Sequence, residues 1–188
     1  MSEKKIPALG YALLGLLQPQ PQSGYDLRKI FSSTSMKTYS DSPGAIYPAL
    51  QRLEKQGLIR GKVENGVGLR RRQLFRVTPA GLSALRKWIE RPVTRGDLVW
   101  GQQEIMLRFA FAHSAAGADA AIALLRSLEA ELKTYISALY EELDKMKEFV
   151  PISGRLAFEC GIRGNECLLS WADSAIADYE NEIKGGTR

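Results

Sequence analysis

The length and composition of the chain exclude several classes of protein. Its 188 residues suffice for one domain of ordinary size or two small ones. Apolar residues make up 45% and charged residues 25%, a balance that supports a packed core and excludes a disordered chain. No segment approaches the roughly 20 apolar residues that a membrane-spanning helix needs, so we expect no membrane association.

The net charge of +5 is distributed unevenly along the sequence. Up to Arg95 there are 17 Lys and Arg against 6 Asp and Glu, which gives a charge of +11. From Gly96 onward the counts are 9 and 15, which gives −6. This asymmetry favours a basic N-terminal domain that holds nucleic acid and a C-terminal domain with a different role.

The first apolar segment, residues 6–17, has two interpretations. Lys4 and Lys5 ahead of an apolar run are typical of a signal peptide. Against that, Pro7 and Tyr11 interrupt the run, and no small-residue cleavage site follows it. We therefore predict the first helix of a domain and a cytoplasmic protein. The apolar face of this helix would consist of Leu9, Leu13, Leu16 and Leu17.

Capping signals predict two further helices in the N-terminal half. Ser23 is a suitable N-cap for a short helix, and Ser42 with Pro43 begins a second one over residues 43–56. Gly57 lies just past the last turn of the second helix, where glycine commonly ends helices. Helical spacing gives this helix an apolar stripe of Ile46, Leu50 and Leu53. Its opposite face carries Tyr47, Gln51, Arg52 and Lys55.

A basic hairpin and one more helix complete the N-terminal pattern. Residues 58–63 and 73–77 read as two strands, and Asn65-Gly66 is a strong turn signal between them. Thr78 with the proline that follows caps a helix whose apolar side is Leu82, Leu85 and Ile89. The order of three helices, a hairpin and a helix predicts a winged helix-turn-helix. The fold class is mainly α with a small β-hairpin.

Several sequence blocks resemble the PadR-like family of bacterial transcriptional regulators. They are Leu13-Leu14-Gly15-Leu16-Leu17, Ser23-Gly24-Tyr25-Asp26-Leu27, Ser42-Pro43-Gly44-Ala45-Ile46-Tyr47-Pro48-Ala49-Leu50, Leu53-Glu54-Lys55-Gln56-Gly57-Leu58-Ile59 and Phe75-Arg76-Val77-Thr78-Pro79-Ala80-Gly81. The resemblance implies a dimeric DNA-binding repressor with an all-helical C-terminal dimerisation region. One departure is Leu74, where the family often has tyrosine, and it affects the packing of the hairpin.

The C-terminal half is predicted to be helical after a junction at residues 92–101. A long helix over residues 119–149 carries a heptad seam that is interrupted at Glu142. The last stretch, residues 155–183, is also helical, and the two long helices can pack on each other. Their remaining apolar surface favours a homodimer over a self-sufficient monomeric hairpin. We expect a DNA-binding domain at 1–92 and a helical dimerisation domain at 93–188.

The residues that would support enzymatic or metal chemistry are scarce. His113 is the sole histidine, and no Cys-x-x-Cys pair is present, so a zinc site lacks ligands. No nucleophile–base pair and no glycine-rich phosphate loop is evident, so we predict neither an enzyme nor a cofactor. Cys160 and Cys167 are interpreted as small apolar fillers in a helix interface, with a regulatory thiol as the alternative.

The predicted DNA contacts come from the helix over residues 43–56 and from the hairpin. We expect this helix to enter the major groove, and two copies in a dimer to lie roughly 34 Å apart on an inverted-repeat operator. The candidate groove or backbone contacts are Ser42, Tyr47 and Gln51, the role of Tyr47 being implied by the resemblance. Arg52 and Lys55 are candidate phosphate contacts, and Arg70, Arg71 and Arg72 would reach the flanking DNA. Lys4, Lys5 and Lys62 are interpreted as solvated surface charges.

Two questions stay open from the sequence. Trp88, Trp100 and Trp171 are candidates for binding a small aromatic effector at the dimer centre, while core packing is the alternative for each of them. The function predicted is a sequence-specific repressor released by a small-molecule or stress signal. The alternative is a winged-helix module that binds protein without direct DNA contact. The sequence does not decide between repression and activation.

Overall fold

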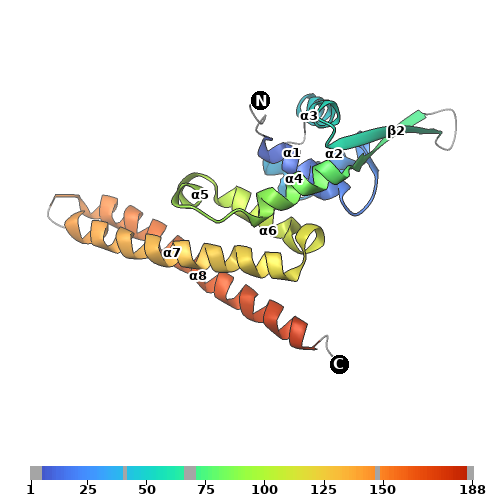
Figure 1. Cartoon of the computed structure of the whole chain (residues 1–188). Coiled ribbons are helices and arrows are strands. Elements are labelled where there is room, and N and C mark those ends of the chain that lie inside the picture. The colour runs from blue at the N-terminus through green and yellow to red at the C-terminus, as the bar shows by residue number, and fades with distance from the viewer. Residues whose placement is uncertain (1–5, 40–41, 66–70, 147–148, 186–188) are drawn as a thin grey trace. The chain divides into compact units, whose positions relative to one another are not determined.

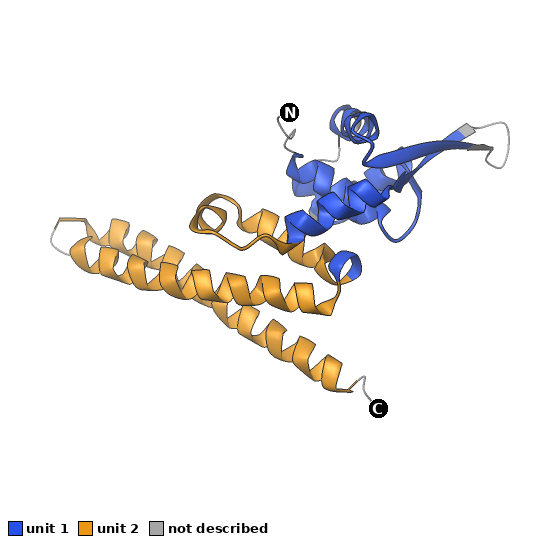
Figure 2. Cartoon of the chain, in the orientation of Figure 1, with its two compact units in different colours: residues 1–89, 114–116 blue, residues 90–113, 117–188 orange. Residues whose placement is uncertain are grey.

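The structure is a computed structural model that describes residues 6–39, 42–65, 71–146 and 149–185. The chain divides into two compact units (Figure 2). The first comprises residues 1–89 and 114–116, and the second comprises residues 90–113 and 117–188. Among the described helices, none is both long enough and apolar enough to cross a membrane.

The first unit contains the predicted order of three helices, a hairpin and a further helix (Figure 1). Its elements are α1 (Ala8–Leu17), β1 (Gln22–Ser23), α2 (Gly24–Ser33), the 3₁₀ helix η1 (Ser35–Thr38), α3 (Pro43–Lys55), β2 (Ile59–Asn65), β3 (Arg71–Val77) and α4 (Pro79–Glu90). The sequence predicted neither β1 nor η1. The observed architecture is therefore a winged helix-turn-helix with a third, very short strand.

The core of the first unit is built from the apolar stripes of its helices and the inner face of its sheet. Helix α1 is deeply buried, because almost all of its residues are apolar and the helix has no polar face that would remain in contact with water. The stripe predicted for α3 is buried, with Ile46, Leu50 and Leu53 no more than 2% exposed. The other fully enclosed side chains include Leu13, Leu14, Leu17, Leu27, Phe31, Leu85 and Ile89.

The boundaries of α3 and α4 follow from local capping. The Ser42 hydroxyl accepts a hydrogen bond from the Gly44 amide at 3.2 Å, as the sequence predicted. Gly57 ends α3 with a φ of +73°, a conformation that side chains rarely adopt. The Thr78 hydroxyl accepts from the Gly81 amide at 3.1 Å and donates to the Gly57 carbonyl at 2.7 Å. This one hydroxyl therefore joins the end of α3 to the start of α4.

The sheet is antiparallel with strand order β1–β3–β2. The register pairs Ile59 with Val77, and Gln22 of β1 with Phe75. Because side chains alternate across a strand, residues 59, 61, 75 and 77 share one face and residues 60, 62, 74 and 76 share the other. Ile59 and Phe75 are at most 5% exposed, so the first face is the inner one.

The second unit is helical, as predicted. Its elements are α5 (Arg95–Trp100), α6 (Gln102–Ala116) up to residue 113, α7 (Ala118–Met146) and α8 (Ile152–Gly185). Helices α7 and α8 lie side by side, and the seam of α7 is buried through Leu125, Leu128 and Leu132 (Figure 1). Toward its C-terminus the burial of α7 weakens, since Tyr140 is 46% exposed.

The segment predicted to be a junction, residues 92–101, contains helix α5. The Thr94 hydroxyl accepts from the Asp97 amide, and the Asp97 carboxylate accepts from the Thr94 amide, so the two form a capping box. Arg91 donates two hydrogen bonds to Asp97, at 2.7 and 2.9 Å, and a third to Glu104 at 3.3 Å. Burial opposes the ionisation of Asp97, but the hydrogen bonds from Arg91 and Thr94 outweigh it and lower the pKa to about 2.

The buried Arg108 lies next to this ion-pair group. Its side chain is fully enclosed, and its Nη2 donates to the carbonyl of Arg91. Burial and the nearby charge of Arg91 lower the pKa of Arg108 to about 10. The start of the second unit is therefore held by charged groups as well as by apolar packing.

The two cysteines were predicted to be small apolar fillers in a helix interface, and within one chain this prediction is wrong. Cys160 and Cys167 are both exposed on α8, with free thiols. The spacing of seven residues places them on the same side of the helix, but the buried residues of α8 are Ile162, Asn165 and Ala172. At about 100° per residue, these buried positions lie on the side of α8 opposite the two thiols.

Candidate nucleic-acid interface

The outer face of α3 presents polar and basic side chains on a rigid support. The exposed residues of this face are Tyr47, Gln51, Arg52 and Lys55, whereas the stripe on the opposite side of the helix is buried. A helix fixed on its apolar side can present the opposite side to a groove without reorganising. The structure therefore brings four of the predicted contact residues onto one surface, with Ser42 exposed at its start.

Tyr47 has a packing role in addition to its exposed position. A Cβ placed on Gly24 would lie 2.6 Å from Cε1 of Tyr47, so the ring rests against the first residue of α2. The Tyr47 side chain is nevertheless 45% exposed. The glycine makes this close approach possible, and the contact joins the two sequence blocks that contain Gly24 and Tyr47.

The outward face of the hairpin carries a group of cations. Arg60 and Arg76 are directly opposite each other in the β2–β3 register, and both are exposed. Lys62 is opposite Leu74 on the same face, and Arg72 is two pairs further toward the tip, opposite Glu64 in the register. Like charges placed directly opposite destabilise a strand pair, so this face carries positive charge at some expense of stability. We call these four residues, Arg60, Lys62, Arg72 and Arg76, the wing cations.

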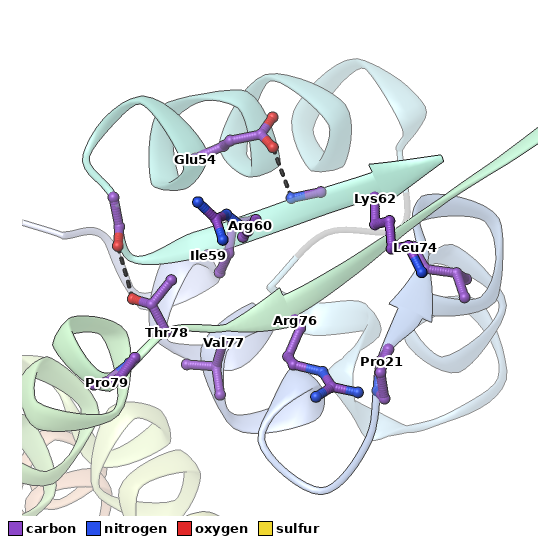
Figure 3. A pocket seen from close by; sticks show the side chains of 12 residues that line it. Pro21, Glu54, Ile59, Arg60, Lys62, Leu74, Arg76, Val77, Thr78 and Pro79 are labelled. Carbon is purple, nitrogen blue, oxygen red and sulfur yellow. Dashed lines mark hydrogen bonds between the residues drawn. The ribbon is translucent and has the colours of Figure 1, made fainter. Parts of the chain in front are cut away.

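Three of the wing cations line a shallow hollow of about 840 Å³ at the base of the hairpin (Figure 3). Pro21, Leu74, Thr78 and Pro79 line it as well. Glu54 of α3 also borders it, and the Glu54 carboxylate accepts a hydrogen bond from the Gly61 amide at 2.7 Å (Figure 3). The Glu54 carboxylate thus binds the backbone of β2, and no ion pair joins it to a wing cation among the contacts of the described residues.

Arg72 is tied to the start of α2. Its Nη2 lies 3.4 Å from Oδ1 of Asp26, and the two side chains are 52% and 41% exposed. Oδ2 of Asp26 accepts hydrogen bonds from the Ser23 hydroxyl at 2.6 Å and from the Ser23 amide at 3.3 Å. These hydrogen bonds from Ser23, aided by the charge of Arg72, lower the pKa of Asp26.

The predicted hairpin contacts are only partly within the described structure. Arg70 lies outside the described residues, and for Arg71 the structure gives the backbone in β3 but not the side chain. Arg72 is exposed on the outward face. Sequence reasoning missed Arg60 and Arg76. Strand alternation was the signal that could have found Arg76, because it places that residue on the same side of β3 as Arg72. Placing Arg60 on this side also requires the register of the hairpin.

The three tryptophans have different surroundings. Trp88 is 6% exposed in the first unit and stacks on Tyr11 at 4.3 Å between ring centroids. Trp100 and Trp171 belong to the second unit, where Trp100 is 89% exposed. Trp171 is 37% exposed and meets Phe109 edge-on at 5.3 Å. Trp88 is thus a core residue of its unit, and of the three tryptophans only Trp171 is both exposed in part and packed against another ring.

The described residues contain no group of three or more His, Cys, Asp or Glu side chains placed to hold a metal ion. His113 instead stacks on Tyr179 at 5.8 Å, and Tyr179 meets Phe109 at 6.2 Å. Burial, with a smaller contribution from Glu182, raises the pKa of Tyr179. The side chains of α6 and α8 in this region therefore offer aromatic ring surfaces to a ligand rather than metal ligands.

Comparisons with known proteins agree on one family. Residues 13–87 match the family described as "Transcriptional regulator PadR-like family". The negative transcriptional regulator PadR of Bacillus subtilis (strain 168) is 25% identical over 182 residues, which cover 93% of this chain and 98% of that protein. These matches concern the region that contains the winged helix and, for the relative, almost the whole chain.

Solved structures of similar proteins include two complexes of Bacillus subtilis PadR. The complex with operator DNA is 24% identical, with a TM-score of 0.44, and covers 92% of this chain and 99% of that one. The complex with p-coumaric acid is 24% identical, with a TM-score of 0.40, and covers 93% and 99%. The Vibrio cholerae virulence activator AphA is 21% identical, with a TM-score of 0.37, and covers 92% and 98%.

Proposed function

Because residues 13–87 place this chain in the PadR-like family of transcriptional regulators, we propose that it is a repressor that binds operator DNA as a homodimer. DNA binding is assigned to residues 1–92 and dimerisation to residues 93–188. A protein that binds chromosomal DNA works where the DNA is, so the proposal places it in the cytoplasm. The relative in Bacillus subtilis is a negative regulator, which supports repression over activation.

One observation carries the proposal for DNA binding. The exposed face of α3 holds Tyr47, Gln51, Arg52 and Lys55 on a helix whose other face is buried in the core. Amide and hydroxyl groups on a helix surface can bond base edges in the major groove, and cations beside them can bond phosphates. The wing cations add positive charge on the neighbouring hairpin, which supports binding to an extended anion such as DNA.

Apolar surface on the second unit supports the homodimer. Phe149, Ile152 and Leu156 are 73%, 66% and 57% exposed around the α7–α8 connection. Contiguous exposed apolar surface is typical of protein interfaces, and these three residues are within eight positions of one another in the chain. A two-fold dimer would present two copies of α3 to an inverted-repeat operator about one DNA turn, roughly 34 Å, apart.

The proposal is tested by fluorescence anisotropy on labelled DNA from directly upstream of the protein's own gene, with scrambled DNA as the control. The expected result is tighter binding to the upstream DNA, with an affinity that falls steeply as salt rises. Absence of binding to either DNA at low salt would contradict DNA recognition. It would favour the alternative of a winged-helix module that binds protein.

Single substitutions on α3 separate base contacts from phosphate contacts. Gln51→Ala is expected to erode the preference for upstream over scrambled DNA by about tenfold. Tyr47→Phe keeps the ring against Gly24 and removes only the hydroxyl, so it tests contact with DNA without loosening α3. Lys55→Gln is expected to weaken binding to the upstream and the scrambled DNA equally, because a phosphate contact carries no sequence information.

A matched control for Lys55→Gln is available on α4. Lys87 is exposed near the end of α4, an element that belongs neither to the hairpin nor to α3. Lys87→Gln changes the net charge by the same amount as Lys55→Gln. Equal loss of affinity in both variants would mean that net charge, and not the surface of α3, governs binding.

We extend the proposal to release by a small aromatic effector at Trp171. Trp171, Phe109, Tyr179 and His113 form a chain of ring contacts on the second unit, and Trp171 is partly exposed. A flat aromatic ligand can stack on or meet such rings edge-on. With p-coumaric acid as the probe, binding is expected to weaken in Trp171→Ala and to be unchanged in the exposed control Trp100→Ala.

A further inference from the structure

A small group of residues joins the start of α2 to both predicted DNA-contacting elements. At its centre, Asp26 accepts two hydrogen bonds from Ser23, at 2.6 and 3.3 Å, and the Asp26 amide donates back to the Ser23 hydroxyl at 3.2 Å. These bonds form a capping box and leave the Asp26 carboxylate little freedom to rotate. The carboxylate is therefore a fixed point on the first turn of α2.

This fixed point is attached to the sheet and to α3. Ser23 pairs with Leu74 in the β1–β3 register, two residues along β3 from Arg72. The residue after Ser23 is Gly24, which packs against the ring of Tyr47. The position of Asp26 is consequently set relative to the hairpin by β1 and relative to α3 by the contact between Gly24 and Tyr47.

Arg72 uses only part of its hydrogen-bonding capacity on Asp26. The ion pair in the structure involves Nη2 of Arg72 and Oδ1 of Asp26, at 3.4 Å. A guanidinium group carries five N–H donors in a planar fork, so donors on its other edges stay available. The Arg72 side chain is 52% exposed, which leaves these donors within reach of a second anion.

We propose that Asp26 is a positioning residue for DNA binding: it holds Arg72 of the wing at a set place relative to Tyr47 of α3, so that one DNA backbone meets both. The inference rests on the proposed function. A long arginine side chain that must be ordered on binding loses rotamer freedom, and an ion pair formed beforehand reduces that loss. The ion pair stays intact in the complex while Arg72 bonds a phosphate through its other donors.

For the neutralisation of Asp26, the proposal predicts a change in DNA affinity opposite in sign to the change that charge repulsion alone would cause. A carboxylate near a DNA-binding surface repels phosphate, so its neutralisation should raise the affinity for every DNA. If Asp26 instead orients Arg72, then Asp26→Asn should lower the affinity for the upstream DNA. Asparagine can still accept the hydrogen bonds from Ser23, so the start of α2 is preserved.

The experiment measures anisotropy for the wild type, Asp26→Asn and a charge-matched control, Glu90→Gln, on upstream and scrambled DNA. Glu90 is exposed at the last residue of α4. Asp26→Asn is expected to weaken binding to upstream DNA about threefold, the effect of one exposed ion pair. Glu90→Gln is expected to leave it unchanged or to tighten it by less than about twofold. Thermal unfolding of each variant verifies that it is folded.

A double substitution tests whether Asp26 acts through Arg72. In the Arg72→Gln background, adding Asp26→Asn should cause no further loss of affinity for upstream DNA. Asp26→Glu keeps the charge and is expected to restore most of the affinity that Asp26→Asn loses. A merely structural role for Asp26 would instead add its loss to that of Arg72→Gln.

The outcomes separate this inference from the proposed function. Tighter binding of Asp26→Asn to both DNAs, or a loss that persists unchanged in the Arg72→Gln background, overturns the positioning role and leaves DNA recognition standing. Failure of the wild type to bind either DNA at low salt overturns both. A loss on upstream DNA that disappears in the Arg72→Gln background supports the inference.

Discussion

Two capping boxes in this chain share a sequence pattern but differ in what their carboxylates bind. Ser23 with Asp26 begins α2, and Thr94 with Asp97 begins α5. The Asp97 side chain is 13% exposed and takes two hydrogen bonds from Arg91, six residues away. Asp26 is 41% exposed and pairs with Arg72, 46 residues away.

The difference shows that a capping motif determines where a helix begins but not what else its carboxylate does. The double hydrogen bond to Asp97 is shielded from water on the carboxylate side, where Asp97 is 13% exposed, so its electrostatic contribution to stability is larger than that of an exposed pair. The pair between Arg72 and Asp26 is open to solvent, where ion pairs contribute little to stability. Asp97 accordingly stabilises the fold, whereas the proposed role of Asp26 is to position Arg72.

The largest expected effect in this comparison comes from Asp97→Asn. Asparagine keeps the acceptor for Thr94 but removes the charged partner of two of the three hydrogen bonds from Arg91, leaving only Glu104, so the free energy of unfolding should fall by about 3 kcal/mol. Urea unfolding followed by circular dichroism measures the loss. A decrease below about 1 kcal/mol would contradict the distinction, because Asp97 would then behave like an exposed carboxylate.

The second effect is the pH dependence that Asp97 confers. Its pKa is about 2 in the folded chain against an ordinary value of 3.8, so the unfolded state binds more protons between these values. The stability from Asp97 is therefore complete above about pH 5 and is lost as the pH falls from about 4 to 2, in total about 2 kcal/mol. Urea unfolding at pH 5 and pH 2.5 should reveal this loss in the wild type and a smaller one in Asp97→Asn.

A smaller effect tests whether the two capping boxes are equivalent as caps. Ser23→Ala and Thr94→Ala each remove a hydroxyl that accepts a hydrogen bond from a backbone amide in the first turn of the helix. Each substitution should lower the free energy of unfolding by about 1 kcal/mol. The same urea experiment applies. Losses that differ by more than about 1 kcal/mol would show that the caps themselves, and not only their arginine partners, distinguish the two helices.

The smallest expected effect on stability comes from Arg72→Gln. Its ion pair is exposed, so the free energy of unfolding should change by less than about 0.5 kcal/mol. The same variant is expected to weaken binding to DNA, which separates the two properties. A stability loss as large as that of Asp97→Asn would mean that the two ion pairs stabilise the fold equally.

The parts of the fold that the sequence predicted are those with signals inside a few residues. Ser42 and Gly57 bound α3, and Thr78 starts α4, because a cap and its partner amide lie within one turn. The buried stripe and the exposed Tyr47 follow from a period of 3.6 residues. Thr94 and Asp97 carried the same kind of signal, so α5 was predictable even though residues 92–101 were interpreted as a junction.

Contacts between distant segments were not predictable in this way. Strand β1 has only two residues, and its pairing with β3 depends on the tertiary fold rather than on a strand pattern. The opposition of Arg60 and Arg76 requires the register of the hairpin, which the sequence of the strands does not determine by itself. The ion pair of Asp26 with Arg72 depends on both features, so it was invisible from the sequence.

The hydrogen bond from the Gly61 amide to Glu54 has a consequence for how this protein avoids unwanted association. Strand β2 is at the edge of the sheet, where an unpaired amide can receive a strand from another chain. Glu54 occupies that amide, and a Cβ on residue 61 would come within 2.7 Å of its Oε1, so glycine is what admits the carboxylate. An incoming strand would have to displace a charged group from this position. At this position the edge is thereby less open to a strand from another chain.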